Sequence, residues 1–410
     1  MVTVMQVIVL DQHPMEDGRV NRHINYLIEK SVKTYRIHIN RSDQTLSEGY
    51  FSTFGEDGYR LNIESATIPF KNTLRDEMYL CTKSFYERIR IAIKKLNIKD
   101  NINTIIHVHD PVLLTLAVKL KLTKFDSAKI VYDRHEVYES KKDVGFLNMK
   151  IPRIARFYEI VARKNIDGIV SVSQEHNASI HVLFPETLIY TVQNFPSIHE
   201  YDKGIIENKL INIPNKNIKL IYVGSLRNSH DRDIDLLLKI FEVVLNQFPT
   251  AHCYIGGRCD DNLRYKFSQL KEQYEGRFEY FGEMPRNDVV KLTESAHIGF
   301  LLIRPETSYW VLTSPNKTYE YLICGVVPII RANVEHVNDY SNCSLIFDRY
   351  TPEGLIIKAV IDLLNDTDRL HTMMEDAYML SKKFIFENVA GKYLLLYESL
   401  FRTNRMDPII

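Results

Sequence analysis

Short runs of β-branched residues alternate with longer stretches of helical periodicity along almost the whole chain, and this alternation limits the possible folds more than any other feature. It is typical of βα units, in which each helix returns the chain to the start of the next parallel strand. The predicted strands are 3–11, 35–41, 59–66, 104–110, 129–133, 168–173 and 188–194 in a first series, and 218–226, 252–257, 278–283, 298–303, 326–332 and 344–348 in a second. Helices are predicted between them, for example at 17–30 and 76–96.

A polar, Asn-rich stretch at 194–217 separates the two series, and it contains Pro196 and Pro214. This composition is typical of a linker. A chain of 410 residues is also longer than one ordinary hydrophobic core requires. We therefore predict an α/β protein with two Rossmann-like domains, one at 1–200 and one at 201–385.

The bulk composition excludes several classes of protein. Lys and Arg together number 52, as do Asp and Glu, so the basic excess of a nucleic-acid-binding protein is absent. The five cysteines form no CxxC pair, which argues against a disulfide framework or a structural zinc site and favours a reducing cytoplasm. No apolar run approaches the ~20 residues of a membrane span, and the first residues predict a strand, not a signal peptide. We expect a cytoplasmic protein with no more than peripheral membrane contact.

The segment from 314 to 330 is the sharpest candidate for a binding motif. Ser314 is a good N-cap, and Pro315 suits the first turn of a helix. The free N–H groups of such a helix start, with Asn316 and Lys317 close by, form an anion site. Glu320 lies one and a half turns further on, where it can accept hydrogen bonds from a ribose diol. The alternative interpretation is an ordinary helix–strand unit with a surface Lys and Glu.

A second candidate motif follows the strand at 218–226. Gly224 lets the backbone approach a phosphate closely, and Arg227 and Arg232 can neutralise a diphosphate without a metal. The alternative is a strand-to-helix turn with solvated arginines. Asp233 and Asp235 form a DxD pattern, but at a predicted helix start the dipole favours acids without any metal. We therefore predict no metal site here.

Polar residues also gather where three strands of the first series end. Since ligands bind at the carboxyl ends of parallel strands, these residues are expected to lie together in a site. His135 can hydrogen-bond a sugar hydroxyl there, although a single such histidine is more often structural. The residues concerned are Gly18, Arg19, His109, Asp110, His135 and Glu136.

Together these segments resemble the GT-B fold glycosyltransferases of family 4, the retaining glycogen-synthase-like group. The resemblance runs from near residue 9 to near residue 400, and it rests on the order and spacing of many short motifs. They include Asp17-Gly18-Arg19-Val20, His107-Val108-His109-Asp110, Asp133-Arg134-His135-Glu136, Tyr222-Val223-Gly224, Gly256-Gly257, Tyr280-Phe281-Gly282 and the 314–330 block. The resemblance implies two Rossmann-like domains facing each other across a cleft, and a terminal helix at 386–410 that crosses back to the first domain.

The resemblance also implies roles for the candidate residues. A nucleoside-diphosphate sugar would be the donor, with its diphosphate held by Gly224, Arg227, Arg232 and the backbone of 314–317, and its ribose held by Glu320. Gly18 would also face the donor. His135 would lie near the transferred sugar, and with Arg227 and Arg232 it forms the predicted catalytic set. On the acceptor side we place Arg19, His109, Asp110 and Glu136, from their positions at the strand ends.

Two positions depart from the family pattern. Ser225 stands where the family has a basic residue directly after the glycine, so that role is assigned to Arg227. Leu312 stands where the first acid of the family's Glu-x7-Glu pair would fall, and Glu306, six residues earlier, is the candidate substitute. These departures affect the contacts to the donor sugar, so the sequence does not identify that sugar.

The predicted function is a retaining hexosyltransferase that needs no metal or other cofactor. No pair of carboxylates is placed for a double displacement, so front-side attack assisted by the leaving diphosphate is favoured. The acceptor is expected to be a glycan or polyprenyl-linked saccharide in bacterial surface polysaccharide synthesis. Basic, amphipathic stretches within 71–164 also suggest contact with an anionic membrane surface.

Two alternatives remain open at this point. A sugar-nucleotide 2-epimerase uses the same fold but needs several acids around the sugar, and this set is not evident in the sequence. A non-catalytic partner subunit would keep the fold without turnover, and the residues at 225 and 312 keep that alternative open. Product analysis separates the first alternative, and nucleotide binding without turnover would indicate the second.

Overall fold

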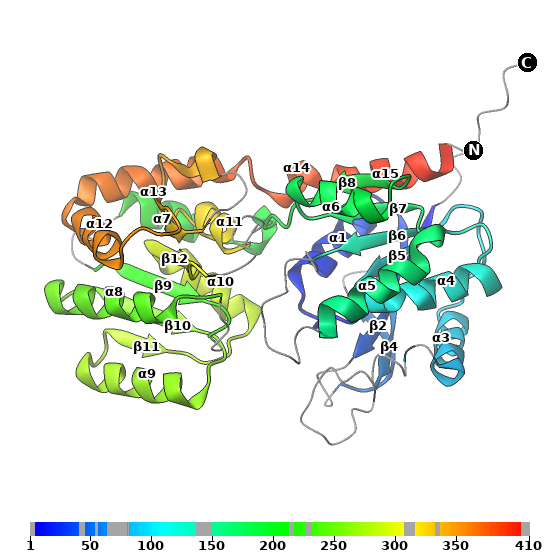
Figure 1. Ribbon diagram of the computed structural model, residues 1–410, viewed down its shortest axis with the longest axis horizontal. Helices are drawn as coiled ribbons and strands as arrows, with labels where there is room; N and C mark the ends of the chain where they lie inside the picture. The colour runs from blue at the N-terminus through cyan, green and yellow to red at the C-terminus, as the bar shows by residue number, and fades with distance from the viewer. Residues whose placement is uncertain are drawn as a thin grey trace, which may run out of the picture. The chain divides into compact units, whose positions relative to one another are not determined.

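The computed structural model describes residues 5–40, 46–53, 56–63, 80, 82–136, 150–212, 217–226, 231–306, 316–332 and 337–402. These residues form two compact α/β units, each built on its own sheet (Figure 1). The first unit contains the described residues up to 136, those from 150 to 193 and those from 389 onward. The second unit contains the described residues from 194 to 388. Arg227, Ser314 and Pro315, three of the predicted site residues, lie outside the described residues.

The first unit is built on an eight-stranded sheet with the order β3-β4-β2-β1-β5-β6-β7-β8. Its strands are β1 (Gln6–Asp11), β2 (Lys33–Asn40), β3 (Gly49–Thr53), β4 (Glu56–Asn62), β5 (Thr104–His109), β6 (Lys129–Arg134), β7 (Gly168–Ser171) and β8 (Leu188–Thr191). All neighbouring strands are parallel except β3, which pairs antiparallel with β4 at the edge. The seven strands predicted for this half are confirmed, whereas β3 was missed because its polar sequence, GYFST, contains no apolar run.

Helices cover both faces of this sheet. They are α1 (Gly18–Glu29), α3 (Lys83–Lys95), α4 (Leu114–Thr123), α5 (Lys150–Ala162), α6 (Glu175–Leu183) and α15 (Gly391–Arg402). The last of these, α15, packs against β7 and β8, where Lys392 donates a hydrogen bond to the carbonyl of Thr191 at 2.9 Å. The helix predicted at 17–30 is confirmed by α1, and α3 accounts for the described part of the one predicted at 76–96 from Lys83 on.

The two faces of the first sheet differ in chemistry because side chains alternate along each strand. One face carries residues such as Ile106, Val108 and Tyr132, which belong to an apolar core packed beneath α3, α4 and α5. The opposite face carries buried polar and charged side chains beneath α1 and α15. They are Asp11, Arg36, His38, His107, His109 and Asp133. A buried polar face is stable only when its groups are paired, so these residues must be connected to one another.

The second unit is built on a six-stranded, fully parallel sheet with the order β11-β10-β9-β12-β13-β14. The strands are β9 (Lys219–Val223), β10 (His252–Gly256), β11 (Phe278–Tyr280), β12 (Ile298–Leu302), β13 (Val327–Arg331) and β14 (Leu345–Phe347). Its helices are α7 (Lys203–Ile211), α8 (Ile234–Gln247), α9 (Asp261–Gln273), α10 (Arg286–Ser295), α11 (Asn316–Ile323), α12 (Glu353–Asn365) and α13 (Thr367–Ser381), and the short α14 (Phe386–Val389) follows. All six strands predicted for this half are confirmed.

The stretch at 194–217 is more ordered than its linker-like composition suggests. It contains α7, whose Ile206 and Leu210 are buried in the core of the second unit. Nζ of Lys209 donates hydrogen bonds of 2.6 Å to the carbonyls of Ala296 and Cys324. The described part of this stretch therefore belongs to the second unit. Its two buried apolar residues, four positions apart, are too weak a helical signal among so many Asn residues.

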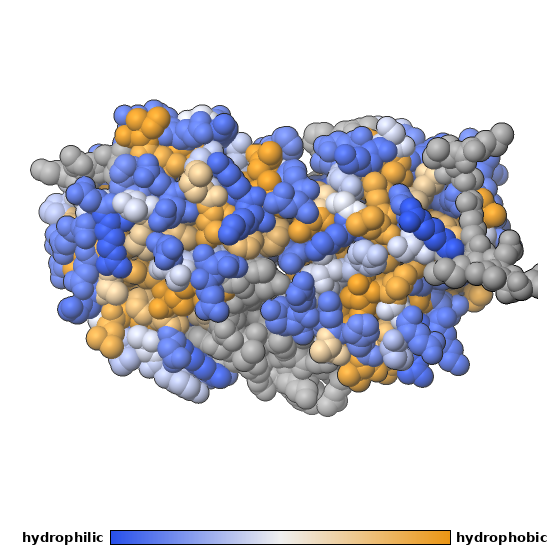
Figure 2. All heavy atoms as spheres, turned by 90° about the horizontal axis from the view of Figure 1, so that it is seen from above, coloured by the Kyte–Doolittle hydropathy of each residue, from blue (hydrophilic) through white to orange (hydrophobic). Residues whose placement is uncertain are grey.

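No helix in the described part of the chain is both long and apolar enough to cross a membrane. On the face displayed in Figure 2, hydrophobic residues lie scattered among hydrophilic ones.

Candidate functional site

Three glycines at the carboxyl edge of the second sheet bring the backbone of neighbouring strands into close contact. Gly224 follows β9, Gly257 follows β10 and Gly282 lies two residues after β11. The amide of Gly257 donates to the carbonyl of Gly282 at 2.6 Å. Gly257 has a φ of +138°, and a Cβ on it would come within 1.8 Å of the carbonyl oxygen of Gly224. Only glycine fits there, and the exposed backbone forms the floor of a pocket.

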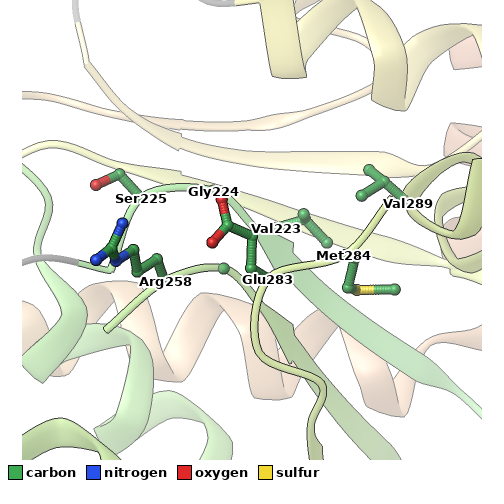
Figure 3. Close-up of a pocket in the computed structure, with 8 residues that line it drawn as sticks. Val223, Gly224, Ser225, Arg258, Glu283, Met284 and Val289 are labelled. Atoms are coloured by element: carbon green, nitrogen blue, oxygen red, sulfur yellow. The ribbon is translucent and has the colours of Figure 1, made fainter. Parts of the chain in front are cut away.

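The pocket at this edge has a volume of about 300 Å³, in the range of small-ligand sites. It is lined by Val223, Gly224, Ser225, Gly257, Arg258, Glu283, Met284 and Val289. Figure 3 shows Ser225 and Arg258 toward one end and Met284 and Val289 toward the other. The pocket therefore offers a polar end with the Arg258 cation and an apolar end, and the Glu283 carboxylate also lines it.

Lys317, in the first turn of α11, brings a cation to Gly224. A Cβ built on Gly224 would come within 2.6 Å of both Cε and Nζ of this lysine. Its Nζ also lies 5.8 Å from the ring centroid of Tyr222, a cation–π contact. Among the described residues, no carboxylate lies within ion-pair distance of this Nζ. Burial, and then the charge of Arg232, lowers the pKa of Lys317 to about 8. An anionic ligand would supply the negative counter-charge that the Lys317 ammonium lacks among the described residues.

Arg232 belongs to the same group of residues. Its Nη1 lies 3.5 Å from Oδ2 of Asp231. Burial raises the pKa of the Tyr222 phenol to about 12, and the nearby charge of Arg232 opposes that rise. The Tyr222 hydroxyl donates to the carbonyl of Ser225 at 3.2 Å. The structure thus brings together Gly224, Lys317 and Arg232, three of the residues that the sequence assigns to a donor diphosphate.

Glu320, one turn further along α11, is held by an arginine that sequence reasoning missed. Nη1 of Arg286 donates to Oε1 of Glu320 at 2.6 Å, and Nη2 of the same arginine donates to Glu200 at 2.9 Å and to the Tyr201 hydroxyl at 3.2 Å. Burial lowers the pKa of the Arg286 guanidinium, but the negative charge of Glu320 has the opposite effect, and the net result is a raised pKa. The only local signal was the position of Arg286, directly after Pro285 at a helix start.

Glu283 lines the pocket itself, whereas the two acids of the DxD pattern have structural partners. Asp233 accepts the amide of Leu236 at 3.1 Å as the N-cap of α8, and it also pairs with the buried Arg331. Asp235 lies 2.9 Å from Nη2 of Arg304. The DxD pattern therefore consists of a helix cap and an ion pair. Glu306 is exposed four residues beyond the end of β12, and Asn316 is exposed at the start of α11.

In the first unit, Arg19 and Asp133 form a fully buried ion pair. Nη2 of Arg19 lies 2.8 Å from Oδ1 of Asp133, and Nη1 donates to the carbonyl of Val192 at 3.0 Å. Gly18 begins α1, whose N-cap Asp17 accepts the amide of Val20 at 3.0 Å. Arg19 therefore ties α1 to β6 beneath the surface, whereas Gly18 lies at the helix start itself.

His109, His135 and Asp110 lie at the carboxyl ends of β5 and β6, where the structure brings them together. Nδ1 of His109 lies 2.8 Å from Nε2 of His135. Nε2 of His13 lies 3.0 Å from Oδ2 of Asp110, and the His13 ring stacks on His135 at 4.8 Å. Burial disfavours the charged form of His13, but Asp110 outweighs it and raises the pKa to about 9. Glu136 is exposed next to His135.

Several residues of these two sites were missed by sequence reasoning. Arg258 follows the Gly256-Gly257 pair directly, so a basic residue after a glycine pair was an available signal. His23 lies four residues after Arg19 on the same face of α1, which a helical projection would have shown. Tyr393 and Tyr397 reach the first unit from the last helix, and no local pattern indicates that contact.

Residues 206–379, within the second unit, match the family described as Glycosyl transferases group 1. No curated protein matches the chain. The chain is similar in structure to sucrose-phosphate synthase from Thermosynechococcus elongatus, with 14% identity, a TM-score of 0.71, and coverage of 97% of this chain and 100% of that one. It is also similar to a UDP-forming trehalose-phosphate synthase from Burkholderia xenovorans, with 11% identity, a TM-score of 0.66, and coverage of 97% and 99%. Anabaena HepE in complex with UDP gives 12% identity, a TM-score of 0.61, and coverage of 96% and 100%.

At these identities the structural likeness establishes the fold, and the family match covers most of the second unit. The glycine-lined edge, the pocket, Lys317 and Glu320 all lie in the matched region. The chain therefore has the GT-B fold, and residues 206–379 of its second domain match the glycosyl transferases group 1 family.

Proposed function

We propose that this chain is a retaining, family 4-like hexosyltransferase that moves a sugar from a nucleoside-diphosphate sugar to a glycan or polyprenyl-linked acceptor. The observation that carries the proposal is the ammonium of Lys317, which lies against Gly224 without an acidic partner among the described residues, next to a pocket of about 300 Å³. A half-buried cation against a glycine backbone suits a diphosphate. The pocket would then hold the nucleoside.

Lys317 and Arg232 would stabilise the charge that develops on the departing diphosphate. Such stabilisation by preorganised cations, together with positioning, supplies most of the catalysis in transfers of this kind. Arg227 and the helix start at Ser314 and Pro315 remain part of the proposal. In this scheme the cations do the work that a metal would do, so no metal is required.

Glu320 would accept hydrogen bonds from the ribose, since Arg286 fixes one of its oxygens and thereby the orientation of the carboxylate. Glu306 would contact the donor sugar in place of the acid that Leu312 replaces. UDP is the first nucleotide to test, because the similar HepE structure holds UDP and the similar Burkholderia synthase is described as UDP-forming.

The first domain would supply the acceptor side through Asp110 and Glu136, with His135 near the transferred sugar. Arg19 and His109 are buried and would support these residues from behind. The outer face of α5 supports contact with an anionic membrane surface. Phe157, Ile160 and Val161 are 60%, 46% and 53% exposed there. Glu159, on the inner face of the same helix, is fully buried and accepts a 2.7 Å hydrogen bond from Arg134. An exposed apolar face flanked by Lys and Arg is typical of helices that lie on anionic bilayers. This fits a cytoplasmic enzyme of bacterial surface polysaccharide synthesis.

A thermal-shift panel tests the donor proposal. UDP, GDP, ADP, dTDP and CMP are added separately in EDTA, and a ligand at 100 times its Kd adds roughly 2.7 kcal/mol of stability. We expect UDP to raise the Tm without metal, and transfer from the matching UDP-sugar to follow. Absence of a shift with all five nucleotides would contradict the proposal, and binding without transfer to any acceptor would indicate a non-catalytic subunit.

A vesicle assay tests the membrane contact separately. The wild-type chain should co-sediment with anionic vesicles at low salt, and the Phe157→Ser/Ile160→Ser double variant should not. Tyr265→Ser is the matched control, because Tyr265 is also exposed but lies on α9 of the second unit. Equal sedimentation of all three proteins would remove α5 as the contact surface.

A further inference from the structure

A continuous path of ring nitrogens and one hydroxyl runs through the polar face of the first domain. Nδ1 of His109 lies 2.8 Å from Nε2 of His135, and Nε2 of His109 lies 3.3 Å from Nδ1 of His23. The Tyr397 hydroxyl lies 2.8 Å from Nε2 of His23 and 2.8 Å from Nδ1 of His107. We call this path, from His135 through His109, His23 and Tyr397 to His107, the histidine chain.

The histidine chain has one exposed end. The side chains of His23, His107 and His109 are fully buried, whereas His135 is 11% exposed. The path therefore leads from the end of β6, where His135 lies, into the interior, and it ends beneath α15, which contributes Tyr397.

A buried carboxylate fixes the direction of the hydrogen bonds. Nε2 of His107 lies 3.5 Å from Oδ2 of Asp133 and has no hydrogen-bond partner among the residues that the structure describes. Burial opposes ionisation of Asp133, but Arg19 outweighs it and holds the pKa of the carboxyl well below its usual value. An ionised carboxylate accepts and cannot donate, so the proton of His107 belongs on Nε2 and its Nδ1 is an acceptor.

The remaining hydrogen bonds follow in order. Tyr397 donates to Nδ1 of His107, so its oxygen accepts from Nε2–H of His23. Nδ1 of His23 then accepts from Nε2–H of His109, and Nδ1 of His109 accepts from Nε2–H of His135. Each imidazole is neutral in this arrangement, which agrees with the burial that lowers the pKa of His23, His107, His109 and His135. The exposed end of the chain is therefore a lone pair on Nδ1 of His135.

We propose that Tyr397 is a positioning residue for His135, because the histidine chain holds His135 in the Nε2–H tautomer and leaves Nδ1 to accept a hydrogen bond. A ligand at this nitrogen must donate an O–H or N–H group, whereas a phosphate or carboxylate oxygen would need an N–H here. Identifying that donor as a sugar hydroxyl rests on the proposed function, but the tautomer itself does not.

The main competing interpretation is a metal site. One ring nitrogen each of His23, His107 and His109 lies within 4.8 Å of the others, as do the ligand atoms of His109, Asp133 and His135. However, in the first group every ring nitrogen except Nε2 of His107 already lies at hydrogen-bond distance from another ring or from Tyr397. The second group includes Asp133, which Arg19 already pairs. The geometry therefore favours a hydrogen-bonded chain.

Two-bond ¹H–¹⁵N spectra of the ¹⁵N-histidine-labelled, metal-free full chain, without donor, test the proposal directly. These spectra distinguish Nε2–H from Nδ1–H imidazole, and the His135→Gln variant assigns the His135 signals. We expect His135 of the wild-type protein to be the neutral Nε2–H tautomer at pH 7.5. A wild-type His135 that is Nδ1–H or charged overturns the proposal before any other variant is made.

Tyr397→Phe removes the hydroxyl and keeps the ring, so the Nε2–H of His23 loses its acceptor in a buried site. Moving that proton to Nδ1 reverses the hydrogen bonds, and His135 should shift to the Nδ1–H tautomer. Tyr393→Phe is the matched control, since its hydroxyl lies on the same helix but donates to Asp133 at 3.3 Å. It should leave the His135 tautomer unchanged.

Three further results overturn the proposal. They are an unchanged His135 tautomer in a folded Tyr397→Phe protein, the same shift in Tyr393→Phe, and stoichiometric Zn²⁺ binding in which the signals of His23, His107 and His109 move together. Because no donor is present, the result does not depend on transferase activity. Failure of the nucleotide panel with a correct tautomer would instead count against the proposed function alone.

Discussion

The Nζ atom of Lys317 lies where a side chain at Gly224 would have to be, since a Cβ built on that glycine would meet it at 2.6 Å. The two residues come from different elements, the end of β9 and the first turn of α11. The glycine therefore makes room for a lysine, and the lysine places its charge at the edge of the pocket.

Gly224→Ala should displace Lys317 and weaken nucleotide binding with little loss of fold. The atoms that a Cβ would meet are the flexible end of the Lys317 side chain. Its displacement should therefore lower the free energy of unfolding by only about 1 kcal/mol. Loss of the lysine contact should reduce affinity for the nucleoside diphosphate by about tenfold. Titration calorimetry and a melting curve measure both effects. Gly354→Ala is the control, because a Cβ there meets nothing within 4 Å. A Gly224→Ala protein with wild-type affinity would contradict the role of Lys317.

Lys317→Met should stabilise the second domain while weakening binding of the diphosphate. Burial lowers the pKa of Lys317 from its ordinary value of 10.5 to about 8, so the folded state disfavours the charge. The unfolded chain then binds more protons between pH 8 and pH 10.5, and wild-type stability should rise with pH across that window. Methionine carries no charge, so the Lys317→Met protein should lack both the loss of stability below pH 8 and the increase in stability between pH 8 and pH 10.5. Chemical unfolding at pH 7 and pH 10 measures the difference.

The same pKa predicts the pH dependence of binding. Affinity of the wild-type protein for a nucleoside diphosphate should fall as the pH rises through 8, because the neutral amine no longer attracts the anion. Lys317→Arg should bind equally well at pH 7 and pH 9, since an arginine stays charged. A wild-type affinity that is constant from pH 7 to pH 9 would show that Lys317 does not contact the anion.

Arg232→Ala should lower turnover by about 10²-fold or more while the protein stays folded, since Arg232 is proposed to stabilise the leaving diphosphate. EDTA should leave wild-type turnover unchanged. The control is Arg264→Ala on α9, outside the residues that line the pocket. Near-normal turnover of Arg232→Ala, or loss of wild-type activity in EDTA, would each count against the metal-free scheme.

Arg19→Met should destabilise the first domain by roughly 3–5 kcal/mol, because it leaves the Asp133 carboxylate buried without its main counter-charge. Adding Asp133→Asn to this variant should restore part of the stability, since the uncompensated charge is then gone. Urea unfolding of the single and double variants measures the recovery. A double variant less stable than Arg19→Met would show that the carboxylate is held by other partners.

Most of the fold could be predicted because its strands are short β-branched runs separated by helical periodicity. That pattern reflects burial on both faces of a parallel sheet, so it located every strand that the structure describes except β3. It fails where burial is one-sided or weak. The edge strand β3 has no apolar run, and α7 contributes only Ile206 and Leu210 to the core.

Only the part of the candidate site that lies at strand ends and helix starts could be predicted from the sequence. Gly224, Arg232 and Lys317 lie at strand ends or helix starts, and the carboxyl edge of a parallel sheet brings such positions together. Arg286 and Tyr397 reach their partners through tertiary packing instead. Tyr397 contacts His23 across 374 residues of sequence, a distance at which local periodicity carries no information.

The first domain is discontinuous, since Tyr393 and Tyr397 come from a helix that follows the whole second domain. During synthesis on the ribosome, all eight strands of the first sheet emerge before this helix exists. Until it arrives, His23, His107 and Asp133 lack the cover that α15 provides, and the polar face of the sheet remains open to water. The described residues of the second domain all lie within 194–388, so they are available before this helix. The helix that covers the polar face of the first domain is thus translated after the whole second domain, so a chain that stops before Gly391 leaves that face uncovered.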